Sequence, residues 1–402
     1  MLVLSFPKNG IGMMSLAEER RRRICTTHVG SLPRPLSLTA KLFARSVGRD
    51  YDPKALADDL KQSVADIVRK QATLGIDVMS DGELSKTSFQ AYVTDRLSGL
   101  EPIKVGADFQ HRVTRENTAF PAFYKDGAHS GTQATRYACT GPIKYVGHDS
   151  LGVDIANFKA ALKGIDAVDI FMPSVSPSSC VGLMENRYYK SDDEHLHAVA
   201  DALREEYKAI VDAGLMVQID DPRLAMNYML NPQMSVEDAR KWAQARIEVL
   251  NHALRGIPAD RIRHHTCYGI NMGPRASDFE LKYLADLIVT INANYYSFEM
   301  ANPRHEHEWK VWENVDLPDG KVLVPGCITN ASLLVEHPEL VAERIVRLAK
   351  VVGRERVVAS SDCGFASTLS TTEPPEIEPE IVWAKFQSLV EGARLATKAL
   401  WT

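Results

Sequence analysis

Short apolar stretches alternate with longer amphipathic stretches along most of this 402-residue chain. The short stretches are rich in Val, Ile and Leu, which predicts buried strands. The longer stretches repeat apolar residues at helical spacing, which predicts helices with one buried face. Strands are expected at 24–30, 77–83, 137–143, 168–174, 215–221, 261–268, 295–300, 322–328 and 357–363. The clearest helices are expected at 53–74, 194–213, 236–255, 338–352 and 379–400.

Strands separated by helices favour a parallel sheet with right-handed crossovers. Eight such units close an α/β (β/α)8 TIM barrel, and the chain is long enough for one barrel with loop insertions. Because nine strands are expected, one is surplus to the barrel or belongs to an extension. An open doubly wound sheet is the alternative, although no Gly-x-Gly-x-x-Gly pattern follows the first strand.

The sequence predicts one catalytic barrel domain over residues 21–402, after an N-terminal extension over residues 1–20. No linker or low-complexity tract marks a second domain. Long polar excursions at 100–136 and 301–320 are expected to form loops over one face of the barrel.

Composition and charge narrow the function classes. The formal net charge of −5 argues against non-specific nucleic-acid binding, which needs a basic surface. No apolar run is long enough to cross a bilayer, so no membrane partner is expected. The six cysteines are widely spread, unlike a disulfide framework, and a reducing cytoplasm is expected. A homo-oligomer is compatible with the sequence.

An imidazole and a thiol lie two residues apart in the stretch RHHTCYG, where a buried strand is expected to end. Side chains at this spacing in a strand face the same way, so His265 and Cys267 converge while His264 turns away. Nitrogen and thiolate ligands are those that Zn²⁺ prefers, although most such pairs are only packed side chains.

Other expected strands also end in polar side chains. They supply His28 and Ser31, Asp81 and Glu83, Asp220 and Asp221, Glu299, and Asp362 and Cys363. In a parallel barrel these ends meet at the C-terminal mouth, where TIM-barrel active sites are built. Buried carboxylates and thiols are costly unless they are paired or metal-bound. The sequence therefore predicts a Zn²⁺ site made of His265, Cys267, Glu299 and Cys363.

These motifs carry a resemblance to a known family. TTHVGSLPRP, DVMSDGELSK, QIDDPRLA, HHTCYG, YYSFEMA and SSDCGF lie in this order between residues 26 and 365. Together they resemble the catalytic half of cobalamin-independent methionine synthase, in the superfamily that includes uroporphyrinogen decarboxylase. The resemblance implies a short, single-barrel member that uses zinc to activate a thiol, which then accepts a methyl or alkyl group.

The resemblance also implies roles for individual residues. His265, Cys267, Glu299 and Cys363 match the zinc ligands, and Ser31, Glu83 and Asp220 match the groups that hold the amino-acid portion of homocysteine. A substrate ammonium needs carboxylates, which Glu83 and Asp220 supply, and a substrate carboxylate needs donors such as the Ser31 hydroxyl. Glu83 and Asp220 are therefore the candidate catalytic residues as well. The expected partners are a small-molecule thiol, homocysteine above all, and a methyl or alkyl donor.

Three features depart from the family pattern. The chain is expected to be the short form, without the second barrel of the long synthases. PGCITNASL lacks the acid histidine that the family pattern implies, and His305 and His307 are candidate substitutes. Asp221 stands where the family has glutamate. The alternative function is that of epoxyalkane:coenzyme M transferase, which adds a different thiol to an epoxide. Coenzyme M carries a sulfonate and no ammonium, so Glu83 and Asp220 favour homocysteine. Candidate binders for a substrate anion are Arg34, Lys86, Arg136 and Arg223. A metal-free decarboxylase and a structural zinc protein are further alternatives, which the complete, widely spaced ligand set disfavours.

Overall fold

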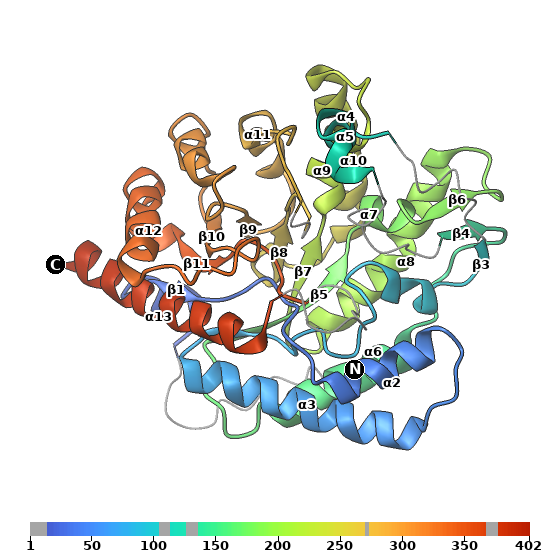
Figure 1. The fold of residues 1–402 in the computed structure, drawn as a ribbon, viewed down its shortest axis with the longest axis horizontal. Helices are drawn as coiled ribbons and strands as arrows, with labels where there is room; N and C mark the ends of the chain where they lie inside the picture. Colours follow the sequence, from blue (N-terminus) through green and yellow to red (C-terminus); the bar gives the residue numbers. More distant parts are fainter. Residues whose placement is uncertain (1–13, 104–112, 126–135, 270–272, 367–376) are drawn as a thin grey trace.

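The central sheet has eight strands in the order β1-β11-β10-β9-β8-β7-β5-β2, and all neighbours are parallel (Figure 1). The computed structural model describes residues 14–103, 113–125, 136–269, 273–366 and 377–402. The barrel strands are β1 (Cys25–Thr26), β2 (Val78–Met79), β5 (Asp169–Val175), β7 (Met216–Asp220), β8 (Ile262–His265), β9 (Tyr295–Phe298), β10 (Val322–Ile328) and β11 (Val358–Ser361). The two edges meet where the Asp77 amide donates to the Thr26 carbonyl over 3.2 Å. The sheet is therefore a nearly closed barrel, and the predicted fold class is confirmed.

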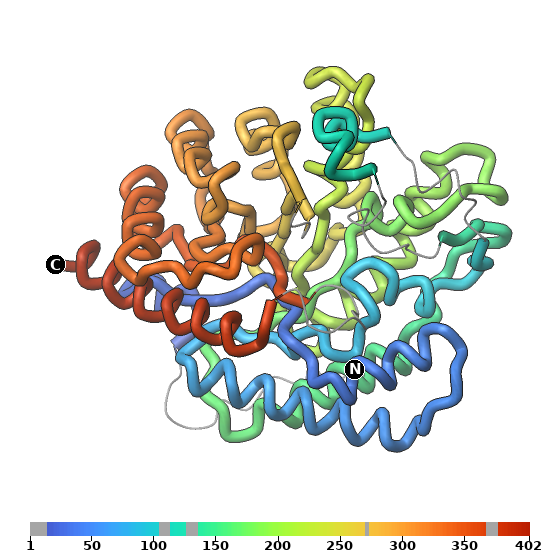
Figure 2. Tube along the Cα trace, viewed as in Figure 1, coloured from blue at the N-terminus to red at the C-terminus, as the bar shows by residue number. Residues whose placement is uncertain are grey.

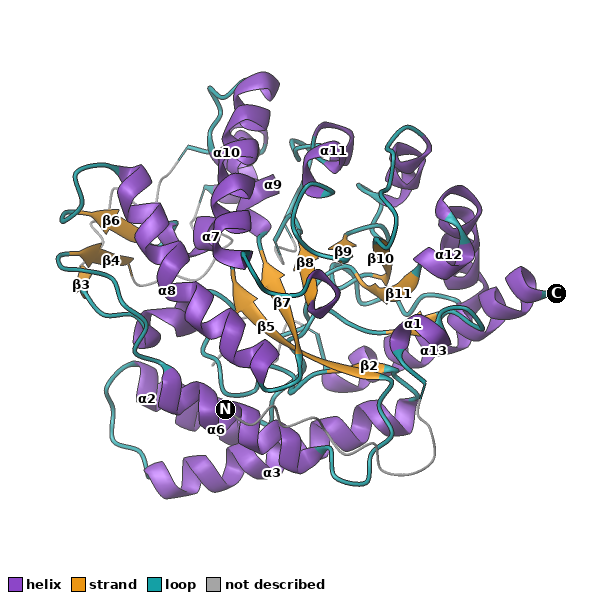
Figure 3. Ribbon diagram, turned by 180° about the vertical axis from the view of Figure 1, so that it is seen from behind, coloured by secondary structure: helices purple, strands orange, loops and turns teal. Residues whose placement is uncertain are grey.

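The ninth expected strand lies outside the barrel. It is β4 (Arg136–Cys139), which pairs with β3 (Leu100–Ile103) and β6 (Met184–Asn186) in a separate three-stranded sheet at one side of the molecule (Figure 3). The described parts of the polar excursion at 100–136 thus contain regular structure; residues 104–112 and 126–135 of that excursion lie outside the described residues.

Helices separate most successive barrel strands along the chain, whereas the 3-10 turn η5 (Glu306–Glu313) lies between β9 and β10 (Figure 2). They are α1 (Leu16–Glu19), α2 (Leu36–Ser46), α3 (Pro53–Leu74), α4 (Arg115–Ala119), α5 (Pro121–Tyr124), α6 (His148–Ala161), α7 (Pro177–Val181), α8 (Asp192–Asp212), α9 (Pro222–Leu230), α10 (Val236–Leu254), α11 (Ala285–Ile288), α12 (Pro338–Val352) and α13 (Pro379–Trp401). Short 3-10 turns are η1 (Ala91–Arg96), η3 (Ala259–Arg261), η4 (Leu281–Tyr283), η5 (Glu306–Glu313) and η6 (Arg354–Arg356). The five predicted long helices are confirmed, and their ends lie within two residues of the prediction.

Local chemistry sets the bounds of the long helices. The Asp52 carboxylate caps α3 by accepting from the amides of Lys54 and Ala55, and Pro53 occupies the first helical position. Gly75 ends the same helix with a φ of 84°, a conformation that glycine adopts without a steric cost. The Ser235 side chain caps α10 in the same way as Asp52 caps α3.

The first two barrel strands are much shorter than predicted. Strands were expected at 24–30 and 77–83, but β1 and β2 each contain two residues. The Gln71 side chain explains the early end of β2. Its amide accepts from the Ser80 N–H over 3.1 Å and donates to the Ser80 carbonyl over 2.9 Å. The Gln71 side chain thus takes the place of a neighbouring strand as hydrogen-bond partner of the Ser80 backbone. Hydrophobic periodicity does not reveal such a contact.

Apolar side chains form one core inside the barrel and a larger one between strands and helices. The interior core includes Leu16 of α1, whose side chain is 4% exposed. The described part of the predicted extension therefore packs against the barrel strands, while its boundary at residue 20 stays a prediction. All six cysteines are buried and free, as expected for a chain without a disulfide framework. No helix among the described residues is long and apolar enough to cross a membrane.

Candidate functional site

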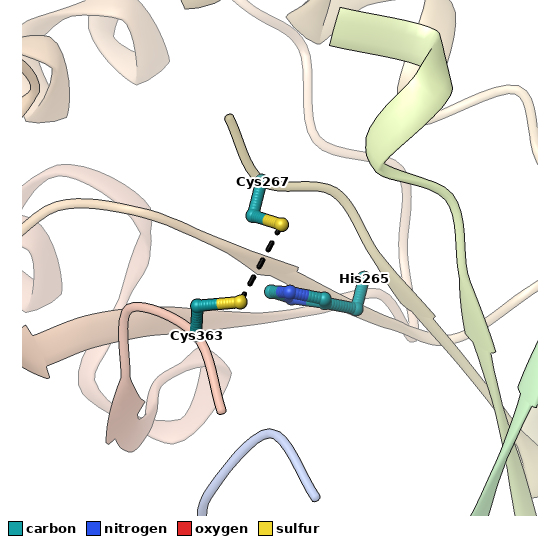
Figure 4. Close-up of side chains that lie close together, drawn as sticks. All are labelled: His265, Cys267 and Cys363. Atoms are coloured by element: carbon teal, nitrogen blue, oxygen red, sulfur yellow. Dashed lines mark hydrogen bonds between the residues drawn. The ribbon is translucent and has the colours of Figure 1, made fainter. Parts of the chain in front are cut away.

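One imidazole and two thiols meet at the C-terminal ends of β8 and β11 (Figure 4). His265 is the last residue of β8, Cys267 follows it, and Cys363 lies just beyond β11. A ligand atom from each residue lies within 4.8 Å of the others. The two sulfur atoms are 3.5 Å apart, far longer than a disulfide bond, and all three side chains are buried. The pair recognised in RHHTCYG thus finds a third partner from the end of the last barrel strand.

This group fits a metal ion. Zinc–sulfur bonds of about 2.3 Å would place two sulfurs of a tetrahedral site roughly 3.8 Å apart, close to the spacing found here. His265 Nδ1 is 3.0 Å from the Ser297 hydroxyl, whereas Nε2 is buried and has no hydrogen-bond partner among the residues that the structure describes. Burial lowers the pKa of His265 to about 3, so its imidazole is neutral, as ligation requires. The hydrogen bond to Cys267, followed by burial, raises the pKa of the Cys363 thiol well above its usual value.

Glu299, the fourth predicted ligand, lies beside this group but is not one of its three members. Its carboxylate accepts from the Tyr268 amide over 2.8 Å, from Arg275 over 3.1 Å and from the Asn302 side chain over 2.7 Å. Asn302 also donates to Asp362 over 3.0 Å, which ties the loop after β9 to the loop that carries Cys363. Ligation by Glu299 stays a prediction.

His305, a candidate substitute for the family's acid histidine, is buried near this carboxylate network. Its Nδ1 is 2.7 Å from Glu308, its Nε2 is 3.4 Å from Asp278, and its ring stacks on Tyr268 at 4.0 Å. Burial lowers the pKa of His305, but the bonds to Asp278 and Glu308 outweigh it and raise the pKa to about 9. His305 is therefore an imidazolium at neutral pH, with a carboxylate facing each ring nitrogen.

The three residues expected to hold an amino acid lie around the loop after β1. The Ala366 amide donates to the Ser31 hydroxyl over 3.3 Å, which places Ser31 against the loop that follows Cys363. Gly30 abuts Glu83 so closely that a Cβ there would lie 2.5 Å from Glu83 Oε1. Gln218 donates to Asp220 over 2.9 Å and also to the carbonyl of Val29 in this loop. Ser31, Glu83 and Asp220 are thus joined through residues 29–31, although their roles remain predictions.

Glu83 has an unusual backbone conformation. Its φ of 55° makes it the one non-glycine residue with positive φ in the described part of the chain. Such strain is tolerated where neighbouring contacts impose it, and it gathers at functional sites. Here Arg34 donates to the carbonyl of Glu83 over 2.8 Å, and also to those of Leu84 and Lys86. Because the Arg34 guanidinium donates to these backbone carbonyls, it stabilises the turn at Glu83. Arg34 is therefore no longer a candidate anion binder.

The carboxyl groups of this pocket repel one another. Burial, and then the nearby Glu83, raise the pKa of Asp220 well above its usual value. Burial also raises the pKa of Asp81 to about 6. One ammonium lies among these acids, because Lys86 Nζ donates to Glu83 Oε2 over 3.2 Å and to the Pro173 carbonyl over 2.6 Å. The site therefore combines a carboxylate pair, one internal cation and an adjacent thiol–imidazole group.

Asp221, where the resemblance implied a glutamate, has other partners than Glu83 and Asp220 have. Its carboxylate accepts from the hydroxyls of Ser178 and Ser179 and lies 4.0 Å from His264, and all four residues are buried. His264 accordingly turns away from His265, as the strand spacing predicts. Of the residues that support the site, Gln218, Arg275 and Asn302 were missed because single polar residues in loops and strands carry no periodic signal.

The chain is similar to known proteins over most of its length. Residues 177–377 match the model of the cobalamin-independent synthase catalytic domain. YxjH, an uncharacterized protein of Bacillus subtilis, is 24% identical over 385 residues, which cover 94% of this chain and 95% of that protein. The methionine synthase of Sulfolobus acidocaldarius is 23% identical over 346 residues, or 85% of each chain.

A solved structure shares the fold. A B12-independent methionine synthase from Shewanella sp. W3-18-1, in complex with selenomethionine, superposes with a TM-score of 0.68 at 19% identity. The match covers 94% of this chain and 99% of that chain. Because the family model spans half of the sequence, from residue 177 to residue 377, the chain belongs to the cobalamin-independent methionine synthase family through its catalytic domain.

Proposed function

We propose that this protein is a zinc-dependent methyltransferase that transfers a methyl group to the thiol of homocysteine and so forms methionine. The group of His265, Cys267 and Cys363 carries the proposal, because it places two thiols and a free imidazole nitrogen together at the barrel mouth. The names of the relatives support the same reaction, since a methionine synthase covers 85% of this chain.

His265, Cys267 and Cys363 would hold the metal, with Glu299 as the fourth ligand. A bound zinc ion supplies the charge that converts a substrate thiol, whose pKa is about 8.5 in water, into a thiolate at neutral pH. Glu299 is suited to make way for that thiol, because its carboxylate already has other donors in Arg275 and Asn302.

The chain's own residues would bind and orient the amino acid. Glu83 and Asp220 receive the substrate ammonium, while the Ser31 hydroxyl donates to the substrate carboxylate. Glu83, Asp220 and Ser31 are nearly fully buried, so they hold the amino-acid end of homocysteine in one place. The thiol end is thereby positioned at the barrel mouth. The thiol loses its proton on binding. Its sulfur then forms the bond to the methyl carbon, and the donor leaves with the electron pair of the broken bond.

A cytoplasmic location and small-molecule partners belong to this proposal. Two free thiols 3.5 Å apart would be oxidised in a compartment that favours disulfides, so the site fits a reducing one. The substrate is the thiol of an amino acid, and the donor is a methylated small molecule or a methyl-carrying group.

Methionine formation tests the proposal directly. The zinc-loaded protein is incubated with L-homocysteine and, in separate reactions, with 5-methyltetrahydrofolate, its triglutamate and methylcobalamin. Methionine in at least one reaction is expected, and the Glu83→Gln variant should raise the KM for homocysteine at least tenfold by removing an ammonium partner. No methionine with any donor, together with a thioether product from coenzyme M and an epoxide, would contradict the proposal in favour of epoxide chemistry.

A further inference from the structure

We propose that Lys86 is a specificity-determining residue, which makes the pocket select zwitterionic amino-acid thiols over thiols that carry only an amine. Its ammonium lies between the acid Glu83 and the Pro173 carbonyl, beside the predicted ammonium site. The inference rests on the proposed function, because it concerns the substrate class of the same pocket.

Lys86 is a rigidly held internal cation. Its side chain is 4% exposed, and its Nζ donates to Glu83 Oε2 over 3.2 Å and to the Pro173 carbonyl over 2.6 Å. The same atom lies 4.4 Å from the centre of the Tyr92 ring. Tyr92 is itself fixed, because its hydroxyl donates to Glu206 over 2.5 Å. A lysine with these contacts cannot move its charge out of the pocket without breaking several of them.

The charge of Lys86 reaches both acids of the predicted ammonium site. It forms a direct ion pair with Glu83, and it lowers the pKa of Asp220 against the opposing effects of burial and Glu83. With Lys86, the pair of carboxylates carries a net charge of −1 when both acids are ionised. Without Lys86, the same pair carries −2 when a substrate ammonium keeps both acids ionised.

This difference decides which thiol the pocket favours. Homocysteine bears its carboxylate on the same carbon as its ammonium, so it brings a negative charge toward the acids together with the positive one. An amine thiol such as 3-aminopropanethiol, which is homocysteine without the carboxylate, brings only the positive charge. A pocket of charge −2 attracts the amine thiol more strongly, whereas an internal cation offsets the repulsion between the acids and the substrate carboxylate.

A purely structural role for Lys86 predicts a different result. If Lys86 only kept Glu83 in place, its removal would weaken the binding of both thiols alike, since both use the ammonium site. A specificity role changes the ratio of the two affinities. The two thiols have the same sulfur arm, so the contribution of the metal cancels from that ratio.

The test is calorimetric titration of the zinc-loaded protein with L-homocysteine and with 3-aminopropanethiol. Wild type is compared with Lys86→Met, which removes the charge at similar length, and with Lys86→Arg, which keeps it. The exposed Lys144, mutated to Met, is the matched control. In Lys86→Met the preference for homocysteine should fall roughly tenfold or more. Lys86→Arg and Lys144→Met should keep at least most of the wild-type preference.

Each other outcome overturns the inference. Equal weakening of both thiols in Lys86→Met would make Lys86 a structural counter-ion, and unchanged binding would make it irrelevant to the substrate. Should Lys86→Met fail to fold, the Lys86→Arg variant decides. Loss of the preference for homocysteine in Lys86→Arg, which keeps the charge, would overturn the inference. A wild-type protein that bound neither thiol would overturn the proposed function as well, which separates the two failures.

Discussion

At the scale of single residues, the site is defined by atoms that lack ordinary partners. Among the described residues, His265 Nε2 is buried without a hydrogen bond, and the sulfurs of Cys267 and Cys363 lie 3.5 Å apart. Leaving such atoms unpaired costs free energy, which a bound metal would recover. These residues could be predicted from the sequence, because a His-x-Cys spacing and an Asp-Cys-Gly strand end can both be found there.

Substituting Cys363 tests this metal group. The Cys363→Ser variant should lose most bound zinc, because serine is a poor zinc ligand, while its circular dichroism spectrum stays that of a folded barrel. Zinc content per chain is measured by atomic emission. Cys327→Ser is the control, since this buried cysteine lies outside the His265–Cys267–Cys363 group and its thiol donates to the Pro325 carbonyl over 3.6 Å. Normal zinc in Cys363→Ser would remove it from the ligand set.

The His305 imidazolium makes stability depend on pH. Its folded-state pKa of about 9 lies above its ordinary value of 6.5, so its stabilising contribution is complete below about 6.5 and disappears as the pH rises through about 9. The shift corresponds to about 3 kcal/mol at most. The difference in unfolding free energy between wild type and His305→Gln should therefore shrink between neutral and strongly alkaline pH. A pH-independent difference in urea unfolding would contradict this assignment.

Other residues of the site could not be predicted from sequence, for a physical reason. Arg275 and Asn302 act on Glu299 from loops, and their contacts are set by the path of the chain rather than by a repeat. Lys86 was one of several candidate anion binders, and the structure places it beside the ammonium site through its bonds to Glu83 and to the Pro173 carbonyl. Sequence spacing reports which residues share a strand, but not which loops meet.

At the scale of elements, the barrel closes at its weakest seam through a side chain. Thr26 and Asp77 share one backbone hydrogen bond between β1 and β2, and the Thr27 hydroxyl donates to the Val78 carbonyl over 3.0 Å. The Asp77 carboxylate adds further bonds at this seam. It accepts from the Thr26 amide over 2.8 Å and from both terminal nitrogens of Arg23 over 2.8 Å. The bounds of the helices and central strands follow from periodicity and capping residues. The seam depends on tertiary contacts instead, so the predicted lengths of β1 and β2 were wrong.

Removing the Asp77 charge should weaken this seam. Asp77→Asn is expected to lower the free energy of unfolding by about 1–3 kcal/mol, because Arg23 keeps Glu19 but loses the charge of its second carboxylate partner. Chemical denaturation measures the loss. Asp58→Asn is the control, since its ion pair with Lys54 is exposed and should contribute much less to stability. Equal stability of the two variants would show that Asp77 does not hold the seam.

At the scale of the whole molecule, the two ends of the described chain complete one barrel. β1 pairs with β11, and α13 packs beside α3 (Figure 2). This closure brings Ser31, from the start of the barrel, against the loop after Cys363, from its end. The alternation of strands and helices was sufficient to predict the barrel. The separate sheet of β3, β4 and β6 was not predicted, because its pairing joins segments that are far apart in sequence.

The central claim is that a substrate thiol binds at the His265–Cys267–Cys363 group and loses its proton there. The most direct measurement is titration of the zinc-loaded protein with L-homocysteine near neutral pH, in two buffers of different ionisation enthalpy. We expect release of about one proton for each homocysteine bound, since the free thiol is mostly protonated at this pH. Binding without proton release, or no binding at all, would contradict the account.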